Sequence, residues 1–257
     1  MIELSHIHKY YNPGTVTEMC LFEDFSLQIA KGEFVSIVGS NGSGKTSLLN
    51  IICGSIPIER GSITIDGRDI TSMKEYVRHQ KIGRVYQDPS KGTCANMTIL
   101  ENMALADNKG KPYGLGRSVK KSRIDAYKEM LSSLNLGLED KIHTRVGSLS
   151  GGQRQAVALL MATMTPIEML ILDEHTAALD PKTAEIIMEL TEKIVREKKL
   201  TTMMVTHNLR YAVEYGDRLL MMHQGEAILD VSKEEKKALT VDDIMGTFNR
   251  ISVECGN

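Results

Sequence analysis

Short apolar runs alternate along this chain with segments whose apolar residues recur at helical spacing. Residues 33–38 (EFVSIV) are rich in β-branched side chains and end at Gly39, a pattern that predicts a buried strand. Residues 169–172 (MLIL) and 201–206 (TTMMVT) predict two further strands. Because strands that alternate with helices form parallel sheets covered on both faces, the pattern predicts an α/β fold.

Two segments carry the signals of helix ends. Gly54 follows an apolar segment and is typical of a helix C-terminus, and Asp180 with Pro181 is typical of an N-cap and a first helical position. The helix before Gly54 would bury Leu48, Leu49, Ile51 and Ile52. The helix after Asp180 would bury Ile186, Ile187, Leu190 and Ile194.

The alternation of strands and helices is interrupted once. Residues 91–149 look helical and more polar, which indicates a helical subdomain inserted into a core formed by residues 1–90 and 150–230. The tail, residues 231–257, predicts an amphipathic helix capped by Thr240, with Asp243 three residues on. Its apolar face would carry Ile244, Phe248 and Ile251. We therefore expect the 257 residues to form a single lobed domain.

Composition narrows the class of protein. With 31 Lys and Arg against 33 Asp and Glu, the formal charge is −2, so no basic field favours nucleic acid as a partner. An apolar run of membrane-spanning length and a signal peptide are both missing from the pattern. The cysteines do not have the spacing of zinc or redox motifs, which is typical of thiols in a reducing compartment. They are Cys20, Cys53, Cys94 and Cys255.

A glycine-rich segment links the first predicted strand to the first predicted helix. It reads GSNGSGKT from residue 39 and matches G-x-x-x-x-G-K-[ST], which requires this context. Glycines let backbone N–H groups close around phosphate oxygens, and the helix N-terminus adds partial positive charge. Lys45 would contact the β- and γ-phosphates of ATP, and the Thr46 hydroxyl would bind Mg²⁺. The expected ATP-binding residues are Gly39, Ser40, Asn41, Gly42, Ser43, Gly44, Lys45, Thr46 and Ser47.

Two carboxylates, Asp173 and Glu174, directly follow the apolar run MLIL. Catalytic groups of open parallel sheets gather at the carboxyl ends of the strands. Asp173 would hold Mg²⁺ through water, and Glu174 would orient or deprotonate the attacking water. Taken alone, the pair is equally typical of an ordinary acidic strand end.

The segment LSGGQ, at residues 149–153, has the chemistry of a second anion site. Ser150 would cap a helix whose first turn is glycine-rich, so that backbone N–H groups are available to an anion. The segment is similar to the signature sequence of ABC ATPases, and the resemblance covers nearly the whole chain. It implies that Ser150, Gly151, Gly152 and Gln153 contact an ATP held by a second copy of the chain.

The same resemblance implies a fold. ABC cassettes are P-loop NTPases with a RecA-like, mostly parallel sheet core, an N-terminal antiparallel β subdomain and an inserted α-helical subdomain. Gln87, in VYQD, resembles the Q-loop residue that contacts Mg²⁺ and water, and Asp180, in ALD, resembles the D-loop. His207 resembles the switch histidine that contacts the γ-phosphate. The implied catalytic residues are Glu174, His207, Gln87 and Lys45, and the implied Mg²⁺ ligands are Thr46, Gln87 and Asp173.

Two positions keep alternatives open. Tyr11, in KYYNPG, resembles the aromatic residue that stacks on adenine, and Tyr10 is the alternative, because stacking requires only a flat π-face. His175 stands where the family usually has proline after the catalytic glutamate. It is either a variant without chemistry of its own or a titratable group that adds pH dependence beside the site.

The resemblance implies the ATP-binding and hydrolysing subunit of a transporter, with ATP and Mg²⁺ as cofactors and a location on the cytoplasmic face of a membrane. The runs DEHTAALDPKT, ENMALA and MMVTHN look similar to a bacterial group of tryptophan/tyrosine-type importers. Such importers pair the ATPase with permease subunits and an extracytoplasmic solute-binding protein. Residues 9–18 also resemble ATPases of macrolide export and lipoprotein release, so an exporter is the alternative. LSGGQ disfavours a P-loop kinase or switch GTPase.

A soluble ABC ATPase acting on DNA or ribosomes is a remote alternative, since this chain has one cassette, no heptad run and no basic excess. For a transporter, motion of the ATPase must reach the permease. We expect a permease helix to dock beside Gln87 on an apolar surface lined by Met97, Ile99 and Leu100. These three residues could instead fill the core of the helical subdomain.

Overall fold

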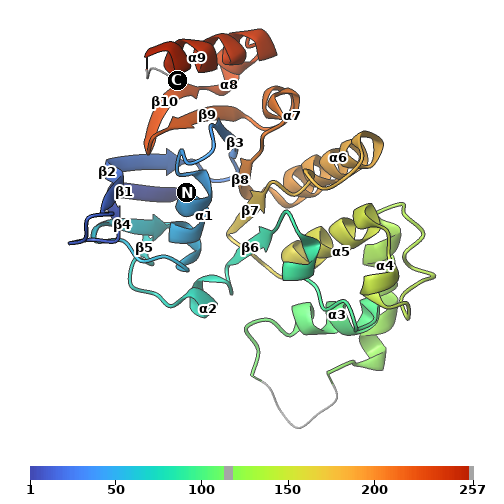
Figure 1. The fold of residues 1–257 in the computed structure, drawn as a ribbon. Coiled ribbons are helices and arrows are strands. Elements are labelled where there is room, and N and C mark those ends of the chain that lie inside the picture. Colours follow the sequence, from blue (N-terminus) through green and yellow to red (C-terminus); the bar gives the residue numbers. More distant parts are fainter. Residues whose placement is uncertain (113–117, 255–257) are drawn as a thin grey trace. The chain divides into compact units, whose positions relative to one another are not determined.

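The computed structural model describes residues 1–112 and 118–254, with side chains described up to residue 250. The chain divides into two compact units, which we describe separately (Figure 1). Unit 1 comprises Met1–His79 and Lys199–Asn257, and unit 2 comprises Gln80–Lys198. The expected division into a core, a helical subdomain at residues 91–149 and a tail stays a prediction.

Unit 1 contains an antiparallel sheet in the order β2-β1-β4-β5. The strands are β1 (Ile2–Tyr11), β2 (Met19–Ile29), β4 (Arg60–Ile65) and β5 (Arg68–Asp69). Ile2, Leu4 and Ile7 of β1 are buried, which gives the sheet one apolar face. This sheet is the expected N-terminal antiparallel β subdomain.

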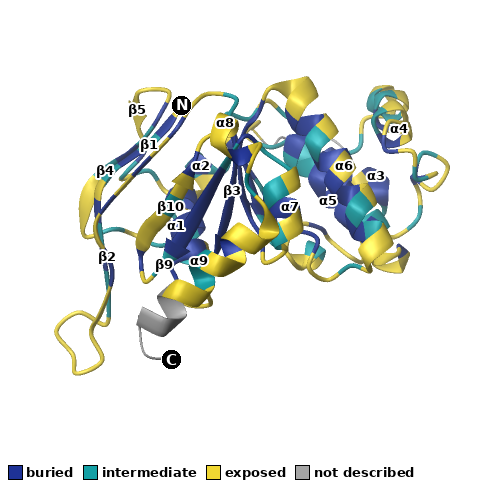
Figure 2. Ribbon diagram, turned by 90° about the horizontal axis from the view of Figure 1, so that it is seen from above, coloured by how far each residue is buried: buried dark blue, intermediate teal, exposed yellow. Residues whose placement is uncertain are grey.

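The buried strand β3 (Phe34–Gly39) organises the rest of unit 1. It lies between β8 (Thr201–Val205) and β9 (Arg218–His223) and pairs in parallel with both. β10 (Glu226–Val231) adds to β9 in the antiparallel direction. All six residues of β3 are buried, as Figure 2 shows in dark blue. A strand buried on both faces is apolar throughout, so the run EFVSIV predicted it correctly.

The helices of unit 1 begin and end at residues with clear local signals. They are α1 (Lys45–Cys53), α2 (Glu75–Arg78), α7 (Leu209–Glu214), α8 (Lys233–Lys236) and α9 (Val241–Glu254). After α1, Gly54 adopts a φ of 84°, and the four predicted core residues of that helix are buried. Thr240 caps α9, because its Oγ1 accepts a hydrogen bond from the Asp243 amide at 3.2 Å. Ile244 and Phe248 pack against the core, whereas the side chain of Ile251 lies outside the described residues.

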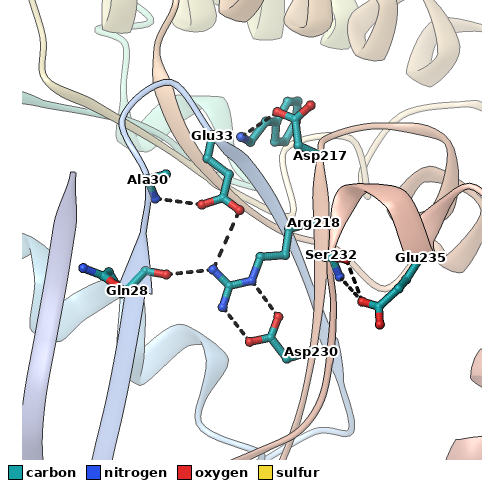
Figure 3. A network of polar contacts seen from close by, with 9 residues as sticks. Gln28, Ala30, Glu33, Asp217, Arg218, Asp230, Ser232 and Glu235 are labelled. Carbon is teal, nitrogen blue, oxygen red and sulfur yellow. Dashed lines mark hydrogen bonds and ion pairs between the residues drawn. The ribbon is translucent and has the colours of Figure 1, made fainter.

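A polar network joins the strands of unit 1 near the start of β3 (Figure 3). Arg218 on β9 donates through Nε to Asp230 Oδ1 on β10 at 2.6 Å and through Nη1 to the Gln28 carbonyl on β2 at 2.7 Å. Glu33 accepts a hydrogen bond from the Ala30 amide at 2.7 Å. The pKa of Arg218 is raised, mainly by the hydrogen bond between its side chain and Asp230. The network therefore connects β2, β9 and β10 through one guanidinium group.

Unit 2 combines a parallel strand pair with helices. The strands are β6 (Ile82–Val85) and β7 (Met169–Asp173). The helices are α3 (Ile99–Asp107), α4 (Ile124–Ser132), α5 (Gly151–Thr163) and α6 (Pro181–Lys198), with short 3₁₀ turns η1 (Pro89–Lys91), η2 (Lys121–Arg123) and η3 (Val146–Ser148). In the part of the chain with defined placement, no helix is long and apolar enough to cross a membrane.

Two expectations about apolar residues are wrong. Ile187, Leu190 and Ile194 are buried as predicted, but Ile186 is 40% exposed, because successive helical residues point in different directions. Ile99 and Leu100 are buried within unit 2, so they belong to its core and do not line a docking surface. Met97 is partly exposed. Cys20, Cys53 and Cys94 form no disulfide, and Cys255 lies outside the described residues.

Candidate nucleotide-binding and hydrolysis site

The glycine-rich loop of unit 1 requires glycine at two positions. Gly39 has a φ of 153°, and a Cβ there would lie 2.2 Å from the Met222 carbonyl oxygen. Gly44 has a φ of 101°, and a Cβ there would lie 3.1 Å from the ring of Phe22. A side chain at either position would force the surrounding backbone or ring to move, so this loop conformation requires glycine at both positions.

Lys45 is held by oxygen atoms of the loop. Its Nζ donates to the carbonyl oxygens of Gly39 and Ser40 at 2.8 Å each, and to Ser43 Oγ at 3.4 Å. The side chain is buried, yet its charge is surrounded by acceptors. Phosphate oxygens are stronger acceptors for an ammonium group than these carbonyls. The loop therefore presents a cation suited to a polyphosphate, next to the exposed hydroxyl-bearing residue Thr46.

Tyr11 is the tyrosine that faces the loop. Its hydroxyl lies 3.0 Å from Ser47 Oγ, in the first turn of α1, and Lys9 Nζ lies 5.5 Å from its ring centroid. Tyr10 instead donates its backbone N–H to Glu59 Oε2 at 3.1 Å. The geometry favours Tyr11 over Tyr10 as the adenine-stacking residue, and this assignment remains a prediction.

His207 is an exposed residue that follows β8 in unit 1. The preceding Thr206 donates its N–H to the Ile37 carbonyl on β3 at 3.1 Å, so the end of β8 is fixed beside the strand that leads into the loop. Asn208 caps α7, since its Oδ1 accepts from the Tyr211 amide at 3.3 Å. His207 thus stands at a strand end where catalytic groups of parallel sheets gather.

In unit 2, the acid pair lies at the carboxyl end of β7. Asp173 Oδ2 accepts a hydrogen bond from Arg84 Nη2 on the neighbouring strand β6 at 2.7 Å, and both side chains are largely buried. The Arg84 guanidinium also lies 4.7 Å from the ring centroid of Tyr86. Arg84 was not among the residues predicted from the sequence. The available signal was its position as a cation three residues before Gln87.

Glu174 has an unusual backbone conformation. Its φ is 50°, in the left-handed region that residues other than glycine and asparagine seldom adopt. The chain turns sharply after it, where the Ala177 N–H donates to the Glu174 carbonyl at 3.0 Å. Such conformations concentrate at functional sites, where the surrounding structure fixes them.

The signature segment begins α5 with a capping box. Ser150 Oγ accepts from the Gln153 amide at 3.2 Å, and Gln153 Oε1 accepts from the Ser150 amide at 3.3 Å. A Cβ on Gly152 would lie 2.2 Å from Cγ2 of Thr183, so α5 and α6 approach closely there. Asp180 Oδ1 accepts from the Thr183 amide at 3.1 Å. The pKa of Asp180 is lowered first by a hydrogen bond with the Thr183 side chain and then by the amide bond.

Gln87 is exposed and follows Tyr86 at the end of β6. The Tyr86 carbonyl accepts a hydrogen bond from Gln155 Nε2 on α5 at 3.1 Å. The segment that leads to Gln87 is therefore connected to α5, the helix that begins at Gly151. Gln87, Asp173 and Thr46 each carry an oxygen donor of the type that Mg²⁺ prefers. Asp173 Oδ2 also accepts the hydrogen bond from Arg84.

His175 is buried and contacts α6. Its Nε2 lies 3.0 Å from Thr191 Oγ1, and 2% of the residue is exposed. Burial lowers the pKa of His175 from 6.5 to about 4, so the ring is neutral at physiological pH. The alternative in which this histidine adds pH dependence near neutral pH is therefore wrong.

Acid should destabilise the fold through His175. Because its folded-state pKa lies below the unfolded value of 6.5, the unfolded chain binds the proton first, and the free energy of unfolding falls as the pH drops from about 6.5 to about 4. We expect a loss of up to about 3 kcal/mol from this group. Urea unfolding of His175→Gln across this pH range should show a shallower pH dependence than wild type. The exposed His143→Gln, in the same unit, is the control and should keep the wild-type dependence.

The chain is similar to known proteins along nearly its whole length. Residues 22–177 match the family model described as ABC transporter. The chain is 48% identical to the tyrosine transport ATP-binding protein of Clostridioides difficile, over 96% of this chain and 98% of that protein. It is 31% identical to the xylose/arabinose import ATP-binding protein of Sulfolobus acidocaldarius, over 100% of this chain and 98% of that protein. A dimeric, post-hydrolysis ATP-binding cassette bound to ADP and Pi superposes with a TM-score of 0.76 at 31% identity, covering 91% of this chain and 99% of that one.

Proposed function

We propose, from the premise that this chain belongs to the ABC transporter family and is an ATP hydrolase of that family, that it powers a bacterial importer of amino acids or similar small solutes. The observation that carries the proposal is the 48% identity, over nearly the full length of both chains, to a protein named for tyrosine transport. The relative that is 31% identical is named for import of the sugars xylose and arabinose. Its name supports import as the direction of transport, but it does not support an amino acid as the substrate.

The chemistry we assign is phosphoryl transfer to water. Lys45 and the loop N–H groups bind the β- and γ-phosphates, and His207 contacts the γ-phosphate. Glu174 orients or deprotonates the attacking water. Thr46, Gln87 and Asp173 would hold Mg²⁺, which neutralises charge on the phosphates when bound. Tyr11 would stack on adenine.

A second copy of the chain completes each site in this proposal. Ser150, Gly151 and Gly152 begin α5 and offer backbone N–H groups to an anion. In a head-to-tail dimer with twofold symmetry, these groups would contact the ATP held by the loop of the other copy. A solved cassette of similar fold is dimeric, which supports the pairing of two copies.

The partners follow from the family. We assign integral membrane permease subunits, an extracytoplasmic solute-binding protein and a position on the cytoplasmic face of the membrane. Ile99 and Leu100 are buried in unit 2, so a permease contact would use other residues. An exporter or lipoprotein-release ATPase is the alternative, supported by the resemblance of residues 9–18.

Uptake measurements test the proposal. Cells that lack the chain should lose uptake of radiolabelled tyrosine or tryptophan, and the wild-type chain should restore it, because ATP hydrolysis drives transport. Affinity purification of the chain from membranes should retain permease subunits, and unlabelled aromatic amino acids should compete for uptake. Normal uptake with retention of labelled solute inside the cells would favour the exporter instead.

A further inference from the structure

The contact between His175 and Thr191 fixes which nitrogen of the histidine carries the proton. Thr191 has one hydroxyl proton, and its Oγ1 donates to the Ile187 carbonyl within α6 at 2.7 Å. At the 3.0 Å contact with His175 Nε2, the Thr191 oxygen is therefore the acceptor. His175 is the Nε2–H tautomer, and its Nδ1 carries the lone pair.

This hydrogen bond lies next to the left-handed residue Glu174. On one side of Glu174, Asp173 is bound to Arg84 of β6 at 2.7 Å. On the other side, His175 is bound to Thr191 of α6. A residue whose two neighbours are both held by side-chain bonds can adopt few backbone conformations. The two contacts hold the residues on either side of Glu174, whose own φ is 50°.

We propose that His175 is a positioning residue for Glu174, acting through its Nε2–H bond to Thr191. Proline, the usual residue of the family at this position, restricts the backbone through its ring. Here a buried side-chain hydrogen bond ties the residue after Glu174 to α6. The inference rests on the proposed role of Glu174 in activating water.

The effect on turnover should be specific. Small displacements of a group that must face the attacking water reduce the rate of chemistry far more than they reduce binding of the nucleotide, which the loop of unit 1 is proposed to hold. Loss of the Thr191 hydroxyl should therefore lower kcat and leave KM for ATP unchanged. A residue that only fills the core would lower stability without this split.

Thr191→Val removes the hydroxyl and keeps the shape of the side chain. We expect Thr191→Val to lower kcat about tenfold and to leave KM for ATP unchanged. The variant Thr191→Ser keeps the hydroxyl and should have a kcat close to that of wild type. The control is Thr163→Val on α5, where a buried threonine makes the same type of bond, from Oγ1 to the Leu159 carbonyl at 2.9 Å, but contacts no histidine. Thr163→Val should retain wild-type kcat. Nitrogen-15 NMR should detect the Nε2–H tautomer of His175 in wild type and its loss in Thr191→Val.

Two outcomes would overturn the inference: a folded Thr191→Val protein with wild-type kcat, or equal losses in both valine variants. The variant Glu174→Gln separates these outcomes from failure of the proposed function. If Glu174→Gln keeps full turnover, the assignment of Glu174 itself fails. If Glu174→Gln is inactive and Thr191→Val is fully active, only the role of His175 fails. Adding Thr191→Val to Glu174→Gln should cause no further loss, because both changes act through the same carboxylate.

Discussion

Replacing Lys45 by alanine is expected to weaken ATP binding and to lower the rate of hydrolysis about 10²–10³-fold. The Nζ group is buried and already directed at oxygen acceptors of its own loop. Its removal deprives the β- and γ-phosphates of the cation that stabilises charge in the transition state. The measurement is ATP binding and turnover of the purified variant.

A matched control separates this chemical effect from loss of a buried lysine. Lys236 is also buried in unit 1, and its Nζ also donates to backbone carbonyls, those of Tyr215 and Gly216. Lys236→Ala should cost stability but leave turnover of the folded protein unchanged. Wild-type turnover in Lys45→Ala would remove the basis for placing ATP at this loop.

Replacing Glu174 by glutamine is expected to lower turnover about 10²–10⁴-fold while ATP still binds. The amide cannot deprotonate water, so the ATP-bound dimer should accumulate instead of being cleared by hydrolysis. Size measurement of Glu174→Gln with and without ATP and Mg²⁺ should show a shift from monomer to dimer.

The control for this change lies at the other end of β7. Glu168 precedes the strand and pairs with Lys81 at 3.2 Å. Glu168→Gln makes the same substitution without touching the proposed hydrolysis residues, and it should hydrolyse ATP at the wild-type rate. If Glu174→Gln remains monomeric at saturating ATP and high protein concentration, the head-to-tail dimer is contradicted.

The features that were predictable from sequence depend on neighbours in the chain. The loop between β3 and α1, the Gly54 helix end and the caps at Ser150 and Thr240 follow from adjacent residue types and backbone preferences. A buried parallel strand is apolar on both faces, so β3 needed no knowledge of its partners. These local signals also carried the family resemblance.

The features that were missed depend on partners far away in the chain. Arg84 and Asp173 meet only because β6 and β7 pair in parallel, in a register that places Arg84 opposite Ile171. The burial of His175 is set by α6, which follows it. The residue types of Ile186 and Ile187 on α6 are the same, so the sequence did not show which of them is buried. The rotation of α6 about its own axis places Ile187 in the core and leaves Ile186 exposed.

The discontinuity of unit 1 affects the order in which its strands emerge from the ribosome. Unit 1 is discontinuous, because β3 precedes unit 2 in the chain while its partners β8 and β9 follow it. At 5–20 residues per second, about 120 residues of unit 2 take roughly 6–24 seconds to leave the ribosome. During that time β3, an apolar strand, has neither parallel neighbour. Unit 2, which is contiguous, can complete its own contacts first. The emerging chain therefore passes through a period in which the apolar strand β3 lacks both of its parallel partners.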